Sequence, residues 1–405
     1  MRKHIAVIII LSIISFVFSS CKINSKPQTK TVIPKTDESE FIKAVWLNYN
    51  ELSMKNEPDK SEKAFREKIQ TVINNCADNG FNRIIFQVRP FCDAFYNSSV
   101  FPASAYLSGV QGEYIGYDVL EIAVEYAKRR NIKIDAWINP FRAAYDTDTA
   151  KLSEDNPAKK WLENESSQRN VIILDNGIYL NPAKSEVQKT VLDGVREILE
   201  NYKVDGIHID DYFYPTADES FDLTEYNEYL QSGGVLSQAD WRRENINTLV
   251  SQIYSTVKSY DEKLLFSVSP GGNIDKNINS YYADVKLWCS EEGYVDVIMP
   301  QLYYGFENEK MPFEKVFNEW QNIKTADSVR LCIGLAFYKY TKEDLYAGTG
   351  INEWKENNDI ISRQIELIAD CENCNGFALY SYSYVFSEKL KEFCNNELQI
   401  IKNMI

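Results

Sequence analysis

The chain has 405 residues, with 44 Lys and Arg against 59 Asp and Glu, and a formal net charge of -15. This charge argues against binding to nucleic acid or electrostatic attachment to anionic lipid, and it permits neutral or cationic ligands such as partly deacetylated amino-sugars. Only two histidines, His4 and His208, are present. We therefore expect neither a metal site nor a cofactor.

The N-terminus has the pattern of a secretory signal. Arg2 and Lys3 precede an apolar run at residues 5–18, which two serines and Cys21 follow. The run is shorter than the ~20 apolar residues that a transmembrane helix needs. A Cys after small residues resembles a bacterial lipobox, so residues 1–21 are predicted to be a lipoprotein signal peptide. Lipid attachment at Cys21 would anchor the protein outside the cytoplasmic membrane, in the cell envelope. The alternative is an ordinary cleaved signal peptide with an incidental Cys.

Residues 22–40 are rich in Lys, Thr, Ser and Pro and are predicted to be a disordered tether. As a flexible chain this tether would reach roughly 25 Å. Residues 41–405 contain no proline-glycine linker and no break in composition, so we expect a single domain with long loops.

Strand-like and helix-like segments alternate along this domain. Amphipathic helix patterns occupy residues 61–79, 118–130, 185–202, 240–259 and 356–371. Eight apolar strand patterns separate them, at residues 44–48, 83–89, 133–139, 204–210, 264–269, 295–301, 330–337 and 376–380. This order predicts an α/β fold, a (β/α)8 TIM barrel with long βα loops. A doubly wound open sheet is the alternative, but no Gly-x-Gly-x-x-Gly follows the first strand.

The fourth predicted strand carries the most informative motif, Val-Asp-Gly-Ile-His-Ile-Asp-Asp-Tyr-Phe-Tyr-Pro at residues 204–215. Alternation along a strand places His208 and Asp210 on one face, opposite the isoleucines between and before them. Catalytic groups of TIM barrels lie at such strand ends. Asp210 and Asp211 are therefore candidate catalytic carboxylates; the alternative is a helix cap or a pair with an Arg. His208 could orient Asp210 or could be a hydrogen-bonded core residue.

Polar and aromatic residues also end the other predicted strands. We expect substrate contacts from Gln87, Arg89, Trp137, Asn139, His208, Tyr212, Gln301 and Tyr303. Amides and guanidinium groups can bind sugar hydroxyls, and flat aromatic rings can cover the apolar faces of pyranose rings. Two long insertions, 143–182 and 212–239, should shape a groove. Within the first, residues 171–180 predict a hairpin that turns at Asn176-Gly177.

Segment 204–215 resembles the glycosyl-hydrolase-like family ten of bacterial envelope lipoproteins. Four further motifs carry the resemblance: Phe86-Gln-Val-Arg-Pro90, Ala136-Trp-Ile-Asn-Pro140, Trp241-Arg-Arg-Glu-Asn245 and Met299-Pro-Gln-Leu-Tyr303. The resemblance covers residues 43–384 and implies a TIM-barrel glycoside hydrolase that acts on an amino-sugar glycan such as peptidoglycan strands. It also implies that Asp210 and Asp211 are catalytic.

The second catalytic group stays open. No Glu ends the fifth or seventh strand, and Asp93 and Glu307 are the nearest alternatives to Asp211. If the substrate's own N-acetyl group is the nucleophile, one acid and one carboxylate that holds the acetamido group suffice. The alternative from another class is a noncatalytic glycan-binding lipoprotein on a degenerate barrel.

Overall fold

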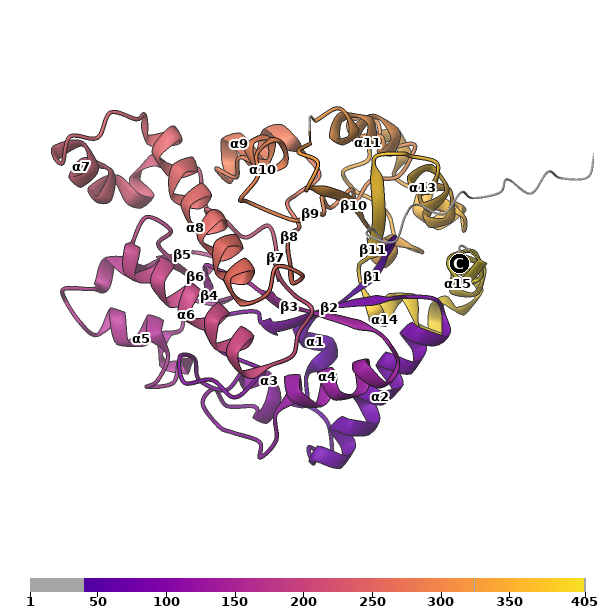
Figure 1. Cartoon of the computed structure of the whole chain (residues 1–405), viewed down its shortest axis with the longest axis horizontal. Coiled ribbons are helices and arrows are strands. Elements are labelled where there is room, and N and C mark those ends of the chain that lie inside the picture. The colour runs from indigo at the N-terminus through magenta and orange to yellow at the C-terminus, as the bar shows by residue number, and fades with distance from the viewer. Residues whose placement is uncertain (1–39, 324, 404–405) are drawn as a thin grey trace, which may run out of the picture. The chain divides into compact units, whose positions relative to one another are not determined.

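The computed structural model describes residues 40–323 and 325–403 (Figure 1). The predicted signal peptide, the lipid attachment at Cys21 and residues 22–39 of the predicted tether lie outside this part of the chain. None of the described helices is long and apolar enough to cross a membrane.

A closed barrel of eight parallel strands forms the centre of the domain. In spatial order, each paired with the next and the last with the first, the strands are β1 (Ile42–Leu47), β2 (Arg83–Arg89), β3 (Lys133–Ile138), β7 (Gly206–Ile209), β8 (Leu265–Val268), β9 (Val297–Ile298), β10 (Arg330–Leu335) and β11 (Cys374–Leu379). Each predicted strand pattern overlaps one of them. The (β/α)8 prediction is therefore confirmed.

Helices surround the barrel and connect its strands (Figure 1). They are α1 (Tyr49–Leu52), α2 (Glu62–Asp78), α3 (Ala105–Ser108), α4 (Val119–Arg129), α5 (Pro157–Leu162), α6 (Ser185–Asn201), α7 (Leu223–Gln231), α8 (Gln238–Tyr260), α9 (Ile274–Ser280), α10 (Val285–Ser290), α11 (Phe313–Gln321), α12 (Glu353–Glu356), α13 (Ile360–Ala369), α14 (Tyr382–Val385) and α15 (Lys391–Asn403). Ser61, Asp118 and Ser237 cap α2, α4 and α8 with side-chain oxygens that accept from the first turn.

Strand alternation divides the apolar side chains between two layers. On β1, Ile42, Ala44 and Trp46 belong to the cluster that fills the barrel interior. Val45 and Leu47 belong instead to the larger cluster between the barrel and its helices. Both faces of a parallel strand are buried in this way, so its sequence is apolar almost throughout.

Gly206 in the fourth-strand motif has a steric role at the N-terminal end of the barrel. A Cβ at this position would lie 2.5 Å from the carbonyl oxygen of Leu265 and 2.7 Å from Oδ1 of Asp135. Asp135 is buried and forms an ion pair with Arg83 of the neighbouring strand. Glycine therefore allows β7 to approach both neighbouring strands closely at this end of the barrel.

The first long insertion folds into a small antiparallel sheet, which Figure 1 shows beside the barrel near α5. Its strands are β4 (Arg142–Ala144), β5 (Val171–Leu174) and β6 (Gly177–Leu180), in the order β4-β6-β5. The predicted hairpin is present, but its turn is Asp175-Asn176, because Leu174 pairs with Gly177. Gly177 has a φ of 148°, and a Cβ there would lie 2.5 Å from the Ala144 carbonyl oxygen. This glycine is therefore needed for the close pairing of β6 with β4 and is not part of the turn.

Candidate functional site

Asp210 lies immediately after β7 at the C-terminal end of the barrel. Its Oδ2 accepts hydrogen bonds from the Trp137 indole (2.9 Å) and from Nδ2 of Asn139 (3.3 Å), both supplied by the end of β3. Within the described part of the chain, its Oδ1 accepts only a long hydrogen bond, from the Tyr212 amide at 3.4 Å. Asp210 is 3% exposed. The predicted pair Trp137 and Asn139 thus orients this carboxyl group.

The surroundings of Asp210 keep it partly protonated near neutral pH. Burial raises its pKa to about 7, and the neighbouring negative charge of Asp211 adds to the rise. Arg142 and the Trp137 hydrogen bond oppose these effects by stabilising the carboxylate. A carboxyl group that can hold a proton at neutral pH suits general acid catalysis.

Asp211 is less enclosed than Asp210 and faces a different set of partners. Burial raises its pKa, while Gln301, Arg142 and Lys276 lower it. Gln301 is itself oriented by a hydrogen bond from its Nε2 to the carbonyl oxygen of Ser269, at 2.9 Å. The two adjacent acids are therefore in different environments, as paired catalytic carboxylates commonly are.

Tyr303 extends this part of the barrel mouth with aromatic surface. Its ring centroid lies 5.7 Å from that of Tyr338 and 6.0 Å from that of Tyr380. Burial raises the pKa of Tyr303 well above its usual value, and the charge of Asp211 contributes. Its phenol therefore keeps its proton and can act as a hydrogen-bond donor beside Asp211.

His208 lies deeper, within the barrel. Its Nδ1 is 2.7 Å from the Ser267 hydroxyl and its Nε2 is 2.9 Å from the Ser269 hydroxyl, while the Trp46 indole donates to Nε2 at 3.4 Å. Burial lowers the pKa of His208 to about 3, so the ring is neutral. These contacts match the hydrogen-bonded core alternative; substrate contact by His208 stays a prediction.

Gln87 and Arg89 are also buried at the end of β2. Oε1 of Gln87 accepts from the Tyr49 amide at 3.1 Å. The pairing register shifts between Gln87 and Arg89, so Arg89 pairs with Ile138 and strict alternation does not hold. The Arg89 guanidinium donates to the Asn139 carbonyl oxygen at 3.1 Å and is 1% exposed. Gln87 thus supports the start of α1 and Arg89 supports the segment after β3. Contact of either residue with substrate stays a prediction.

Tyr212 is the most accessible of the predicted site residues, with 42% of its surface exposed. The Arg142 guanidinium lies 4.2 Å from the centre of its ring and 4.6 Å from the centre of the Phe91 ring. A cation between two aromatic faces stabilises both. Arg142 therefore connects the loop after β7 with the loop after β2.

The family model described as Glycosyl hydrolase-like 10 matches residues 41–346. This chain belongs to that family. Glycosyl hydrolase YngK of Bacillus subtilis (strain 168) is 33% identical over 321 residues, which are 74% of this chain and 61% of that protein. Glycosyl hydrolase DigH of Escherichia coli (strain K12) is 31% identical over 307 residues, 69% of each chain. The match thus spans less than two thirds of the Bacillus relative.

Solved structures with low sequence identity share the fold of this Glycosyl hydrolase-like 10 chain. The PgaB (BpsB) glycoside hydrolase domain from Bordetella bronchiseptica has a TM-score of 0.60 at 10% identity, over 88% of this chain and 99% of that one. The GH20 exo β-N-acetylglucosaminidase from Vibrio harveyi has a TM-score of 0.52 at 12% identity, over 90% and 54%. The predicted TIM-barrel architecture of glycoside hydrolases is confirmed by these likenesses.

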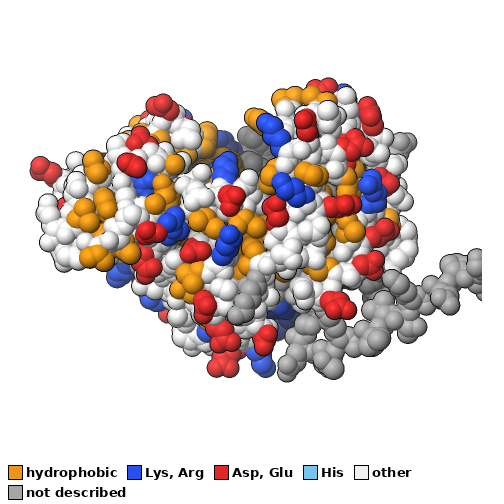
Figure 2. All heavy atoms as spheres, turned by 90° about the horizontal axis from the view of Figure 1, so that it is seen from above, with side chains coloured by type: hydrophobic (Ala, Val, Ile, Leu, Met, Phe, Trp, Pro, Cys, Tyr) orange, Lys and Arg blue, Asp and Glu red, His pale blue; other side chains and the backbone are white. Residues whose placement is uncertain are grey.

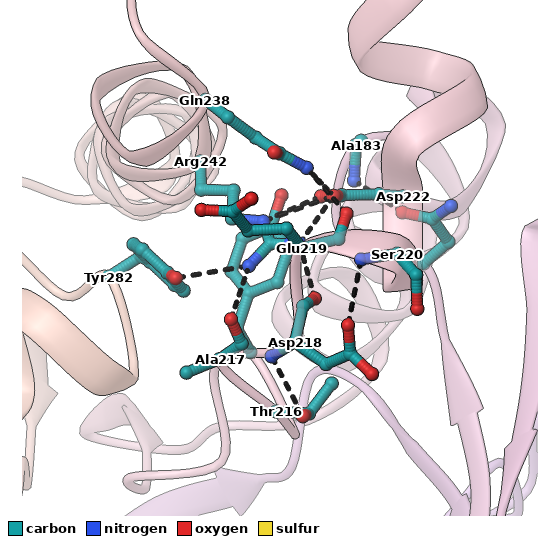
Figure 3. A network of polar contacts seen from close by, with 12 residues as sticks. Ala183, Thr216, Ala217, Asp218, Glu219, Ser220, Asp222, Gln238, Arg242 and Tyr282 are labelled. Atoms are coloured by element: carbon teal, nitrogen blue, oxygen red, sulfur yellow. Dashed lines mark hydrogen bonds and ion pairs between the residues drawn. The ribbon is translucent and has the colours of Figure 1, made fainter.

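A buried ion pair anchors the loop that follows Asp210 and Asp211 in this family member (Figure 3). Nη2 of Arg242, on α8, lies 2.6 Å from Oδ1 of Asp222 and 2.8 Å from the Asp218 carbonyl oxygen. Nη1 donates to the Tyr282 hydroxyl at 3.0 Å. Arg242 lies in the motif at residues 241–245, and its fork of donors fixes the end of the loop that is distant from Asp210 and Asp211.

Glu51 is a carboxylate at the barrel mouth that the sequence analysis did not identify. Its Oε2 accepts from the Asn48 amide (2.7 Å), and its Oε1 accepts from the Ser381 hydroxyl (2.7 Å) and the Ser383 amide (2.6 Å). Asn48 and Glu51 form a capping box at α1, a signal that the sequence does contain. Glu51 is thus occupied in joining β1 to the segment after β11, and burial raises its pKa.

The surface of the domain carries mixed charge. Seen from above, Lys and Arg side chains are interspersed with Asp and Glu (Figure 2).

Within the described residues of 40–323 and 325–403, no group of three or more His, Cys, Asp or Glu side chains could hold a metal ion.

Proposed function

We propose that this protein is a glycoside hydrolase of the cell envelope that cleaves an amino-sugar glycan such as peptidoglycan strands. The main support for this proposal is the environment of Asp210. Its carboxyl group has a pKa of about 7 and is held by Trp137 and Asn139 at the barrel mouth beside Asp211. The family and the names of its relatives support the reaction class.

Asp210 serves as the general acid in this proposal. Two N–H donors occupy its Oδ2, so the proton resides on Oδ1, whose contact with the Tyr212 amide is long. In the first step Oδ1–H protonates the glycosidic oxygen as the bond from that oxygen to the anomeric carbon breaks. Asp210 then holds a negative charge that the Trp137 hydrogen bond stabilises.

Asp211 orients the substrate's acetamido group in a substrate-assisted mechanism. The acetamido carbonyl oxygen forms a bond to the anomeric carbon while the leaving group departs with the proton of Asp210. Asp211 accepts the acetamido N–H, and the Tyr303 hydroxyl can donate to the same group. Water then attacks the anomeric carbon, the bond to the acetamido oxygen breaks, and Asp210 takes the proton of that water.

The cell-envelope location rests on the N-terminal sequence pattern that ends at Cys21. A lipid anchor there, followed by the polar segment 22–40, would hold the domain near the membrane and within reach of wall glycan. The net charge of -15 suits a neutral or partly cationic amino-sugar polymer.

A noncatalytic glycan-binding lipoprotein is the second candidate, and the 3% exposure of Asp210 favours it. The two candidates predict the same aromatic mouth and differ in turnover. The full chain in detergent should be incubated with intact, peptide-stripped and deacetylated wall glycans, and the products read by mass spectrometry. Shortened glycans from the wild type but not from Asp210→Asn support the hydrolase. Binding without new reducing ends in any glycan would overturn it.

A further inference from the structure

A cavity lies between the loop after β2 and the segment 143–152. Its volume is about 330 Å³, which is within the range of ~300–1,000 Å³ for small-molecule sites. Phe91, Tyr106 and Tyr145 supply its aromatic lining. Tyr145 is 61% exposed, and its ring centroid is 5.9 Å from that of Phe91. Aromatic surface of this kind is available to a ligand because the protein itself covers only part of it.

Packed side chains link the lining of the cavity to the loop that carries Asp210. Phe91 contacts the Arg142 guanidinium, whose other face contacts Tyr212, two residues after Asp210. Phe91 also packs on Tyr106 with an angle of 15° between the rings. A chain-like ligand with one unit at Asp210 can therefore extend across Tyr212 and Arg142 to the cavity without leaving the surface.

A buried carboxyl group, Asp93, lies among the lining residues of this cavity. Asp93 is 2% exposed, and its Oδ2 accepts from Nε2 of Gln111 at 3.2 Å. Its Oδ1 accepts no hydrogen bond from the described protein. Burial raises its pKa to about 6. Hydrogen bonding by Gln111, Ser104 and Ala105 to this carboxyl group and the positive charge of Arg89 oppose the rise. A buried acceptor without a partner costs free energy that a ligand donor would recover.

The basic groups at the rim of the cavity have partners already. Lys151 lies 2.7 Å from a carboxylate oxygen of Asp146 and 3.8 Å from one of Asp148. Lys55 lies 5.9 Å from the centre of the Tyr106 ring. Because these cations are neutralised or stacked, the unmatched group is the Asp93 acceptor, and the complementary ligand presents hydrogen-bond donors.

We propose that this cavity is a distal sugar-binding subsite, in which one pyranose ring of the glycan stacks on Tyr145 and donates a hydrogen bond to Asp93. The donor is a hydroxyl or an ammonium group of a hexosamine. This inference rests on the proposed function for the identity of the ligand as a glycan. It adds a second contact point that would favour extended chains over short fragments.

Binding to chito-oligosaccharides of increasing length, fully acetylated and fully deacetylated, tests the subsite by calorimetry. The full chain with Asp210→Asn is the background, so that no cleavage occurs during titration. Tyr145→Ala should weaken binding of the longest oligomers about tenfold, which is the effect of losing one stacked ring. Tyr114→Ala is the matched control, because Tyr114 is a similarly exposed tyrosine (55%) on the segment between α3 and α4 and lines a different cavity.

Asp93→Asn identifies the donor. A weaker affinity for the deacetylated series alone assigns an ammonium group, and a weaker affinity for both series assigns a hydroxyl. Affinity that stays unchanged in both Tyr145→Ala and Asp93→Asn overturns the subsite. Binding with these losses but no turnover by the wild type would refute the hydrolase and leave the subsite standing. Tyr145 is at the surface, so its variant keeps the test valid if Asp93→Asn fails to fold.

Discussion

The Trp137 indole donates a hydrogen bond of 2.9 Å to Oδ2 of Asp210, across the junction between β3 and β7. The same indole ring lies edge-on to His208, with 6.2 Å between ring centroids. Trp137 therefore joins the apolar filling of the barrel to its polar mouth. Burial and the charge of Asp211 favour the neutral form of Asp210 and raise its pKa to about 7, whereas Arg142 and the Trp137 hydrogen bond favour the charged form.

Asp210→Asn should abolish glycan cleavage, with kcat lower by about 10²–10⁴-fold, because an amide cannot donate a proton to the leaving group. In the wild type, activity should fall as pH rises through about 7, since the acid form of Asp210 is lost there. A pH profile of kcat and a thermal melt check both points. Turnover by Asp210→Asn, or a wild-type rate that stays level to pH 9, would contradict the assigned role.

Trp137→Phe keeps most of the ring and removes the donor to Oδ2. Loss of a bond that stabilises the charged form should raise the pKa of Asp210, so the alkaline limb of the pH profile should move up by about one pH unit. Trp46→Phe is the control, because the Trp46 indole bonds to His208 at 3.4 Å and not to Asp210. Equal shifts in the two variants would show that the effect is not specific to the Trp137 bond.

Arg242→Ala should destabilise the domain by about 3–5 kcal/mol, because it leaves the Asp222 carboxylate buried without its charge partner. Glycan turnover should fall as well, since the loop after Asp210 and Asp211 loses its anchor. Arg196→Ala removes a half-exposed ion pair with Asp193 and should cost about 1 kcal/mol or less. Denaturant unfolding of both variants measures the difference, and similar losses would disprove the anchoring role.

Gln301→Ala and Arg89→Ala should have opposite signatures. Gln301 is partly exposed beside Asp211, so its loss should raise KM by about 3–10-fold and change Tm little. Arg89 is 1% exposed and donates a hydrogen bond to the Asn139 carbonyl oxygen, so its loss should lower Tm more than it changes KM. Steady-state kinetics with melting curves separates the two effects. A lower Tm for Gln301→Ala with unchanged KM would remove that residue from the substrate site.

Glu397 on α15 should make stability depend on pH. Burial raises its pKa from 4.5 to about 7, and its Oε1 accepts from the Tyr340 hydroxyl at 2.5 Å. Because the folded protein binds this proton more tightly than the unfolded chain, Glu397 stabilises the fold fully below pH 4.5. This stabilisation is lost as the pH rises through about 7. Between pH 5 and 8 the free energy of unfolding of the wild type should fall by up to about 3 kcal/mol through this group, and Tm should fall with it. Glu397→Gln should remove this part of the fall. Glu388→Gln, an exposed site, should leave the slope unchanged, and so should Glu397→Gln if this assignment is wrong.

The repeating patterns of the sequence were sufficient to predict the fold and the position of Asp210 at the end of a barrel strand. Strand alternation placed Asp210 on the face opposite Ile209, and the eight strand ends predicted a polar mouth, because side-chain direction in a strand follows from a local period of two. The motif at 204–215 also predicted the family, because its residues lie in one continuous segment and can be compared without knowledge of the fold.

Only the tertiary structure decided which distant side chains meet. Glu51 bonds to Ser381, 330 positions away, and His208 bonds to Ser267 and Ser269. The register shift at Arg89 and the hairpin turn before Gly177 depend on neighbouring strands. Local periodicity carries no information about register between strands, because pairing partners are chosen by packing across the whole barrel. The sequence by itself thus determined which strand ends in Asp210, and the assembled barrel determined the buried environment that raises the pKa of this carboxyl group.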